Sequence, residues 1–368
     1  MEKNYWKTIK PELIKYGFDI DDYFLDNISL KTNIEYIKEK IFRSPTLIYD
    51  FNDSLKNSSK IMIKKCNSSG EEINHFELDI FLGKGSYNNV YKIKDILNKM
   101  NYTFRFSIIK INKIKFLIDN YIETFIHAFF SIYQKIYLLT DTTNINNILK
   151  LKHFGYDPTN NSINTISDFM EGTLYDILAI QEIPLNLKKK ILLKALIQIT
   201  CLLENIQDNF KFVHNDLKLN NIFYKIIDVN KSDKYCLDNI HFFIGDFGSS
   251  RFELNEKLII SNEDLAKDTS FNSRKDLFLL INSLYFIFND NFWMNNFFNK
   301  FSLDPKIPNN NENLVKLYYL DEKDIDTIFK PSNFKIFLNE QFNVSIDYSN
   351  DVILTVFGAK YKIKYNSN

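Results

Sequence analysis

The sequence has few cysteines, no net charge and no long apolar run, and each of these absences excludes a class of protein or of partner. Its 368 residues include only Cys66, Cys201 and Cys236, which are too far apart for a C-x-x-C pair. This spacing suits neither a disulfide framework nor a zinc site and favours a reducing compartment. The 46 basic and 46 acidic side chains cancel, so no overall field favours nucleic acid or an anionic membrane as a partner.

Neither a secretory leader nor a membrane span is expected. Residues 1–19 carry Glu and Lys side chains among the apolar ones and lack the apolar core of a signal peptide. The most apolar stretch, residues 277–288, contains Asn282 and Ser283 and is too short to cross a bilayer, so it predicts a buried helix. We therefore expect a cytoplasmic protein.

The chain length suggests about two domains, and the apolar pattern divides the chain into three parts. Residues 1–74 mix helical periodicity with polar breaks and are interpreted as an N-terminal extension of undefined role. Residues 75–172 predict a small sheet with one amphipathic helix. Residues 173–368 are mostly helical, with a long apolar-rich helix near their start. The expected strands are 75–81, 90–96 and 104–111, and the expected helices are 119–139 and 187–206.

The most specific signals are two polar loops, each flanked by apolar runs. Residues 213–223 read V-H-N-D-L-K-L-N-N-I-F, and residues 242–248 read F-F-I-G-D-F-G. In this order they resemble the H-x-D-x-x-x-x-N catalytic loop and the D-F-G metal-binding motif of the eukaryotic-type protein-kinase superfamily. Residues 273–284 resemble the central helix of the kinase C-lobe, especially in casein-kinase-1-like members.

The resemblance implies a role for each polar residue in these loops. Asp216 would orient the attacking hydroxyl or accept its proton, and Lys218 would neutralise charge on the transferred phosphoryl group. Asn221 and Asp246 would hold Mg²⁺, because amide and carboxylate oxygens suit a hard cation that also bridges the phosphates of ATP. His214 is expected to be structural and to pack behind the loop.

A loop with two glycines stands between the first two expected strands. Residues 83–90 read G-K-G-S-Y-N-N-V, and Gly83 and Gly85 would let backbone N–H groups approach phosphate oxygens. Asn88 replaces the third glycine of the kinase G-x-G-x-x-G-x-V pattern, although Asn tolerates the left-handed conformation that glycine usually supplies. A plain hairpin turn is the alternative, whereas the resemblance makes Gly83, Gly85 and Val90 part of an ATP site.

Lys110 is a cation within an apolar strand candidate, twenty residues after Val90. A buried ammonium needs anionic partners, and the phosphates of ATP would supply them together with Glu123, the only acid in residues 120–139. Lys113 is a rival cation, and an edge-strand lysine that points to solvent is the alternative.

Residues 166–174 resemble the kinase hinge, in which backbone groups bind the edge of the adenine ring. Phe169 and Met170 would supply these backbone groups. Glu171 and Asp176 are candidates for contacts with the ribose hydroxyls. A strand end that leads into a helix cap is the alternative for this segment.

Four departures from the kinase pattern matter. Besides Asn88, Asn215 replaces the arginine before the catalytic aspartate, the A-P-E motif is absent, and residues 246–276 form a short segment. Without that arginine, activity is expected not to depend on phosphorylation of this segment. Farther along the chain, Asp276 would anchor the backbone of the catalytic loop.

The resemblance implies a bilobal α+β kinase fold: an N-lobe with a five-stranded antiparallel sheet and one main helix, and a mainly helical C-lobe. It also implies an ATP- and Mg²⁺-dependent serine/threonine kinase whose partner is a protein substrate. Lys218 and the complete D-F-G motif favour a protein substrate, but a small-molecule phosphotransferase and a catalytically inactive scaffold remain alternatives. The frequent Asn, Ile, Lys and Tyr resemble proteins of A+T-rich genomes, among them large DNA viruses, which would place the chain in a host cytoplasm.

Overall fold

The computed structural model describes residues 5–50, 62–66, 72–85, 88–107, 114–138, 146–262, 271–288, 323, 325–347 and 352–363. These residues form a mixed α+β protein with antiparallel sheets, which confirms the expected class. The chain divides into two compact units. The first comprises Met1–Lys135, Leu149–Met170 and Leu254–Asn262, and the second comprises Ile136–Ile148, Glu171–Glu253 and Glu263–Asn368. Within the described ranges, no helix combines the length and apolarity that a bilayer span needs.

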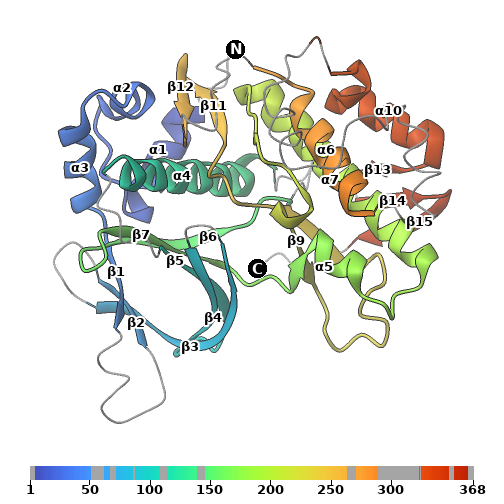
Figure 1. Ribbon diagram of the computed structural model, residues 1–368, viewed down its shortest axis with the longest axis horizontal. Helices are drawn as coiled ribbons and strands as arrows, with labels where there is room; N and C mark the ends of the chain where they lie inside the picture. Colours follow the sequence, from blue (N-terminus) through green and yellow to red (C-terminus); the bar gives the residue numbers. More distant parts are fainter. Residues whose placement is uncertain are drawn as a thin grey trace. The chain divides into compact units, whose positions relative to one another are not determined.

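Seven described strands of the first unit close into a barrel in the order β1-β2-β3-β4-β5-β7-β6 (Figure 1). All neighbours are antiparallel except β1 and β6, which pair in parallel at Thr46 and Tyr156. The prediction of a five-stranded antiparallel sheet is therefore wrong, because the described strands form a closed barrel with one parallel pair. The strands are β1 (Thr46–Asp50), β2 (Met62–Cys66), β3 (Glu72–Lys84), β4 (Asn88–Asp95), β5 (Asn101–Ser107), β6 (Leu151–Asp157) and β7 (Ser162–Asp168).

Residues 1–74 contribute directly to this barrel. They supply β1, β2 and the first residues of β3. The sequence did not predict β1 and β2 because each has five residues, too few for a clear period-two alternation beside the polar stretches around them. The range interpreted as an extension thus shares a unit with the residues expected to form the N-lobe.

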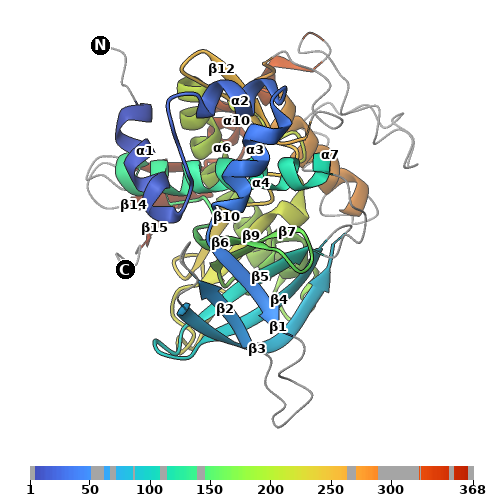
Figure 2. The ribbon, with the colours of Figure 1, turned by 90° about the vertical axis from the view of Figure 1, so that its left-hand side faces the viewer.

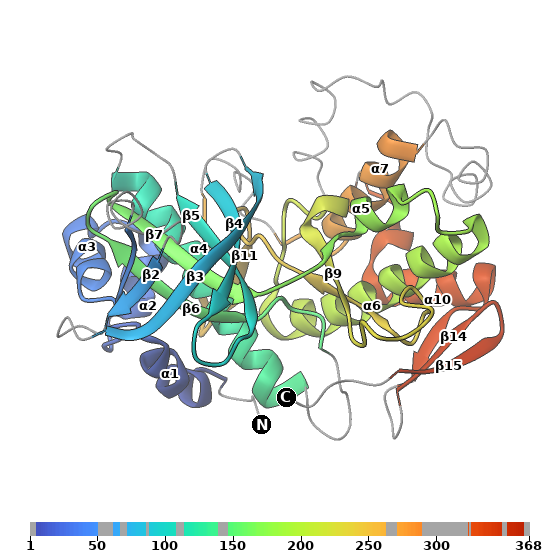
Figure 3. The ribbon, with the colours of Figure 1, turned by 90° about the horizontal axis from the view of Figure 1, so that it is seen from below.

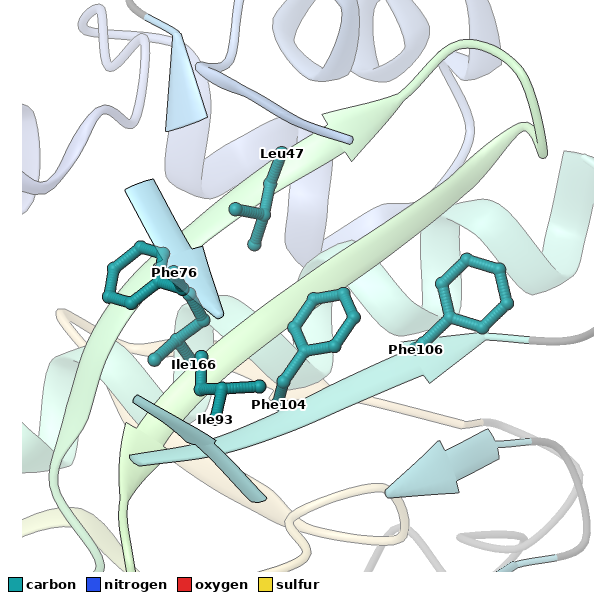
Figure 4. Close-up of a cluster of buried hydrophobic side chains, with 6 residues drawn as sticks. All are labelled: Leu47, Phe76, Ile93, Phe104, Phe106 and Ile166. Carbon is teal, nitrogen blue, oxygen red and sulfur yellow. The ribbon is translucent and has the colours of Figure 1, made fainter. Parts of the chain in front are cut away.

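Apolar side chains fill the barrel (Figure 4). Phe104 and Phe106 point inward, so Arg105 between them points outward, because successive side chains of a strand face opposite sides. Burial of each large apolar side chain contributes about 1.5–3 kcal/mol to stability. The buried cluster consists of Leu47, Phe76, Ile93, Phe104, Phe106 and Ile166.

Four helices of the first unit gather beside the barrel (Figure 2). The ring of Phe125, on the fourth helix, lies 5.7 Å from that of Phe18 and 5.3 Å from that of Phe24, measured between centroids. The helix expected over 119–139 starts earlier than predicted and ends in a π-helical turn, η2 (Gln134–Leu138). The helices are α1 (Tyr5–Tyr16), α2 (Phe24–Leu30), α3 (Ile34–Phe42) and α4 (Ile114–Tyr133).

Helices dominate the second unit, as expected. The helix predicted over 187–206 is α6 (Leu185–Phe210), and the buried apolar stretch forms α7 (Lys275–Phe288). The other helices in the described part of this unit are α5 (Leu174–Ala179), η3 (Leu219–Asn221), η6 (Thr327–Phe329) and α10 (Pro331–Phe342).

Two three-stranded sheets accompany these helices. One contains β8 (Gly172–Thr173), β9 (Ile222–Ile226) and β10 (Ile240–Ile244). The other contains β13 (Ser345–Asp347), β14 (Val352–Val356) and β15 (Ala359–Ile363), and it lies beside α6 and α10 (Figure 3). β11 (Arg251–Leu254) spans the point where the chain re-enters the first unit, which also contains β12 (Lys257–Ile260).

Candidate functional site

The polar ends of the two motif loops meet at one end of an antiparallel strand pair. Asn221 directly precedes β9, and Asp246 follows β10 by two residues. Ile222 pairs with Ile244, and the N–H of Gly245 donates to the carbonyl oxygen of Asn221 at 3.1 Å. The strand register therefore brings the backbones that carry Asn221 and Asp246 together.

Three of the predicted residues are in direct contact. The Asp216 Oδ2 atom accepts hydrogen bonds from Lys218 Nζ at 2.7 Å and from Asn221 Nδ2 at 3.1 Å. Asn221 Nδ2 also donates to the Asp216 carbonyl oxygen at 2.8 Å. Because the amide nitrogen of Asn221 is used in this way, its Oδ1 is the atom suited to a cation.

Asp246 has an unusual backbone conformation. Its φ of 63° lies in the left-handed region, which non-glycine residues seldom occupy and which occurs disproportionately at functional sites. Among the described residues, no group of three or more His, Cys, Asp or Glu side chains is arranged to hold a metal. Asn221 and Asp246 offer an amide oxygen and a carboxylate, a kind of donor that fits Mg²⁺ because that ion usually keeps several waters and binds through one or two carboxylates plus phosphates.

Asp276, at the start of α7, anchors the backbone of the loop that carries Asp216. Its carboxylate accepts from the N–H of His214 at 2.9 and 3.0 Å and from the N–H of Asn215 at 3.0 Å. Complete burial raises the pKa of Asp276, while the charge of His214 and the two backbone N–H groups act in the opposite direction. His214 Nε2 lies 3.1 Å from the Gly245 carbonyl oxygen and its ring packs against Phe247, the structural position expected of it.

Asn215 connects the loop that carries Asp216 to the residues that follow Gly248. Its φ is 64°, and its Nδ2 donates to the Ser249 carbonyl oxygen at 3.0 Å. Its side chain is buried and neutral. This position therefore joins the two loops through an amide hydrogen bond and not through a cation that would bind a phosphate.

The glycine loop connects β3 and β4. Gly83 pairs with Val90, and the N–H of Gly85 donates to the Asn88 carbonyl oxygen at 2.8 Å. Asn88 does not use the left-handed conformation, because it is the first residue of β4 and pairs with Ser107. A Cβ added to Gly83 would meet nothing within 4 Å, and one added to Gly85 would meet only the Asn88 carbonyl oxygen at 3.7 Å. The described structure gives no steric reason for either glycine.

Glu123 pairs with a cation that the sequence analysis missed. Lys110 lies outside the described residues, whereas the guanidinium of Arg105 contacts both carboxylate oxygens of Glu123. Arg105 is opposite Val90 in the β4–β5 ladder and opposite Thr165 in the β5–β7 ladder. The detectable signal was its place between Phe104 and Phe106, which puts it on the outer face of the barrel.

The predicted hinge lies where the chain leaves the first unit. Phe169 and Met170 belong to no strand, so the β7 and β8 ladders do not use their backbone groups. Glu171 Oε2 accepts from the Ile226 N–H at 3.0 Å, and burial raises its pKa. Asp176 forms a capping box with Thr173 at the start of α5. Both ribose candidates therefore already have structural hydrogen bonds.

The chain matches no protein-family model, and no curated protein matches it significantly.

Proposed function

We propose that the chain is an ATP- and Mg²⁺-dependent protein kinase that phosphorylates serine or threonine hydroxyls, with the two units as the lobes of a kinase-like fold. The observation that carries the proposal is the contact set of Asp216, Lys218 and Asn221 beside Asp246, with Asp276 holding the loop backbone. These residues stand in the order and spacing of the two kinase motifs, and the β9–β10 register supports their convergence.

Each residue of the cluster has a chemical role in this proposal. Asp216 orients the hydroxyl of the protein substrate and accepts its proton. Lys218, 2.7 Å from Asp216, neutralises charge on the transferred phosphoryl group. Asn221 and Asp246 would hold Mg²⁺, which would supply positive charge to offset that of the phosphates.

The first unit supplies the nucleotide-binding residues. Gly83 and Gly85 carry no side chain that would keep a phosphate away from the loop between β3 and β4, which gives a reason for glycine where the described structure shows no steric one. Val90 covers the base, and the backbones of Phe169 and Met170 bind its edge. Lys110 contacts the phosphates.

Arg105 is a second candidate for the phosphate-binding cation, in addition to Lys110. Its ion pair with Glu123 and its place opposite Val90 favour it. We also propose a cytoplasmic location and a protein partner, with no nucleic acid or membrane partner.

Transfer of labelled γ-phosphate from Mg-ATP to casein and to a basic protein tests the function. We expect transfer by the wild type, loss in Asp216→Asn, and retention in the control Asp233→Asn, which changes an exposed aspartate of the same unit. Loss in both variants would point to damage to the fold. A wild type that binds Mg-ATP but transfers nothing to protein overturns the proposal in favour of a small-molecule phosphotransferase or a scaffold.

A further inference from the structure

Lys31 ends α2 and joins three segments that are distant in sequence. It is the C-cap of that helix, with a left-handed φ of 48°. Its Nζ lies 2.7 Å from Asp119 Oδ1 and donates to the Ser261 carbonyl oxygen at 3.0 Å. The side chains of Lys31 and Asp119 are 11% and 10% exposed, so solvent screens this ion pair far less than a surface pair.

Asp119 belongs to α4, the helix that carries Glu123. The two carboxylates are four residues apart, which is about one helical turn, so a shift of α4 at Asp119 also moves Glu123. Glu123 in turn holds Arg105 of β5. Lys31 therefore acts on the position of the Glu123–Arg105 pair through one rigid element.

Ser261 directly follows β12, and along the chain it comes fifteen residues after Asp246. Its side chain is fully buried, so the hydrogen bond from Lys31 to Ser261 lies within the packed interior of the first unit. β12 contacts both α2 and α4. The Lys31 ammonium thus joins the 246–276 segment, at Ser261, to the helix that carries Glu123.

We propose that Lys31 is a positioning residue for phosphotransfer, holding α4 and the part of the 246–276 segment at Ser261 in the arrangement in which Glu123 pairs with Arg105. This rests on the proposed kinase function. It gives the N-terminal helices a task within that function. It also fits the neutral Asn215, because an internal lysine organises the segment where no phosphate-binding cation stands before Asp216.

The test compares Lys31→Met with Lys257→Met. Lys257 also links β12 to α2, through Asp26 at 2.6 Å, but the two side chains are 46% and 48% exposed, so this pair contributes little. Lys31→Met removes the positive charge that faces the buried carboxylate of Asp119. The loss of this ion pair weakens the attachment of α4 to α2 and to Ser261. We expect kcat to fall by about 10- to 100-fold in Lys31→Met with little change in the KM for the protein substrate. Lys257→Met keeps the wild-type rate.

Hydrogen exchange separates positioning from general destabilisation. In Lys31→Met we expect faster exchange in α4 and β12 only, whereas a merely structural role would raise exchange throughout the unit. If Lys31→Met does not fold, Lys31→Met/Asp119→Leu removes both charges of the pair and should fold with the same slow transfer. A rate equal to that of the wild type in the folded variant overturns the positioning role alone. A wild type without transfer activity overturns the kinase function and with it this role.

Discussion

At the scale of single residues, Lys194 is a buried lysine that takes no part in the proposed chemistry. It lies on α6 with no exposed surface, and its Nζ donates to the carbonyl oxygens of Leu237 and Ile240. Burial lowers the pKa of Lys194 to about 7. Two carbonyl acceptors match the two N–H groups of a neutral amine, so the fold accommodates the uncharged form.

This predicts a pH dependence of stability. The pKa of Lys194 is lower in the folded chain than the ordinary 10.5, so the unfolded state binds the proton more tightly and stability rises with pH between about 7 and 10.5. The free energy of unfolding of the wild type should increase by about 1–3 kcal/mol from pH 7 to 9 relative to Lys194→Met. Urea unfolding at both pH values measures this. A difference that does not change with pH contradicts the assignment.

Arg105 gives a second prediction at this scale. Arg105→Met should lower kcat/KM for ATP by about 10- to 100-fold, because it takes from Glu123 the partner that holds α4 to β5. Arg105→Lys keeps the positive charge and should lose less. Steady-state kinetics with Lys110→Met in parallel measure both cations, and an Arg105→Met enzyme with unchanged kcat/KM would leave Lys110 as the phosphate-binding cation.

At the scale of elements, α7 holds, through Asp276, the backbone of the loop that carries Asp216. In Asp276→Asn an amide donor replaces one carboxylate oxygen and faces the N–H groups of His214 and Asn215. We expect the free energy of unfolding to fall by about 1–3 kcal/mol and phosphotransfer to be lost. Chemical unfolding and the transfer assay measure the two effects. As a control, Asn282→Ser changes a polar residue later in α7 whose side-chain amide donates to the Phe278 carbonyl oxygen of the same helix, and it should keep activity.

At the scale of the whole molecule, the N-terminal helices belong to the packed first unit. Phe18 and Phe24 are buried against Phe125 of α4. Deletion of residues 1–44 should lower the thermal unfolding midpoint by about 10 °C or more, because several large apolar side chains lose their burial. Scanning calorimetry measures this. A truncated chain with the wild-type midpoint would show that these helices are a separable extension.

Features that depend on residues close together in the chain could be predicted from the sequence. Asp216, Lys218 and Asn221 lie within six residues, so their spacing alone brings their side chains within reach of one another. The long helices α6 and α7 were predictable because an apolar face repeats with the period of a helix over many residues.

Contacts between residues far apart in the chain could be recognised only in the folded structure. Lys31 lies 88 residues from Asp119 and 230 from Ser261, and β1 closes the barrel against β6 more than a hundred residues later. No periodicity links residues so far apart. The partner of a buried charge depends on which side chain the packed elements bring within reach. For this reason the ion pair of Glu123 with Arg105 of β5, eighteen residues away, was not predicted from a local pattern.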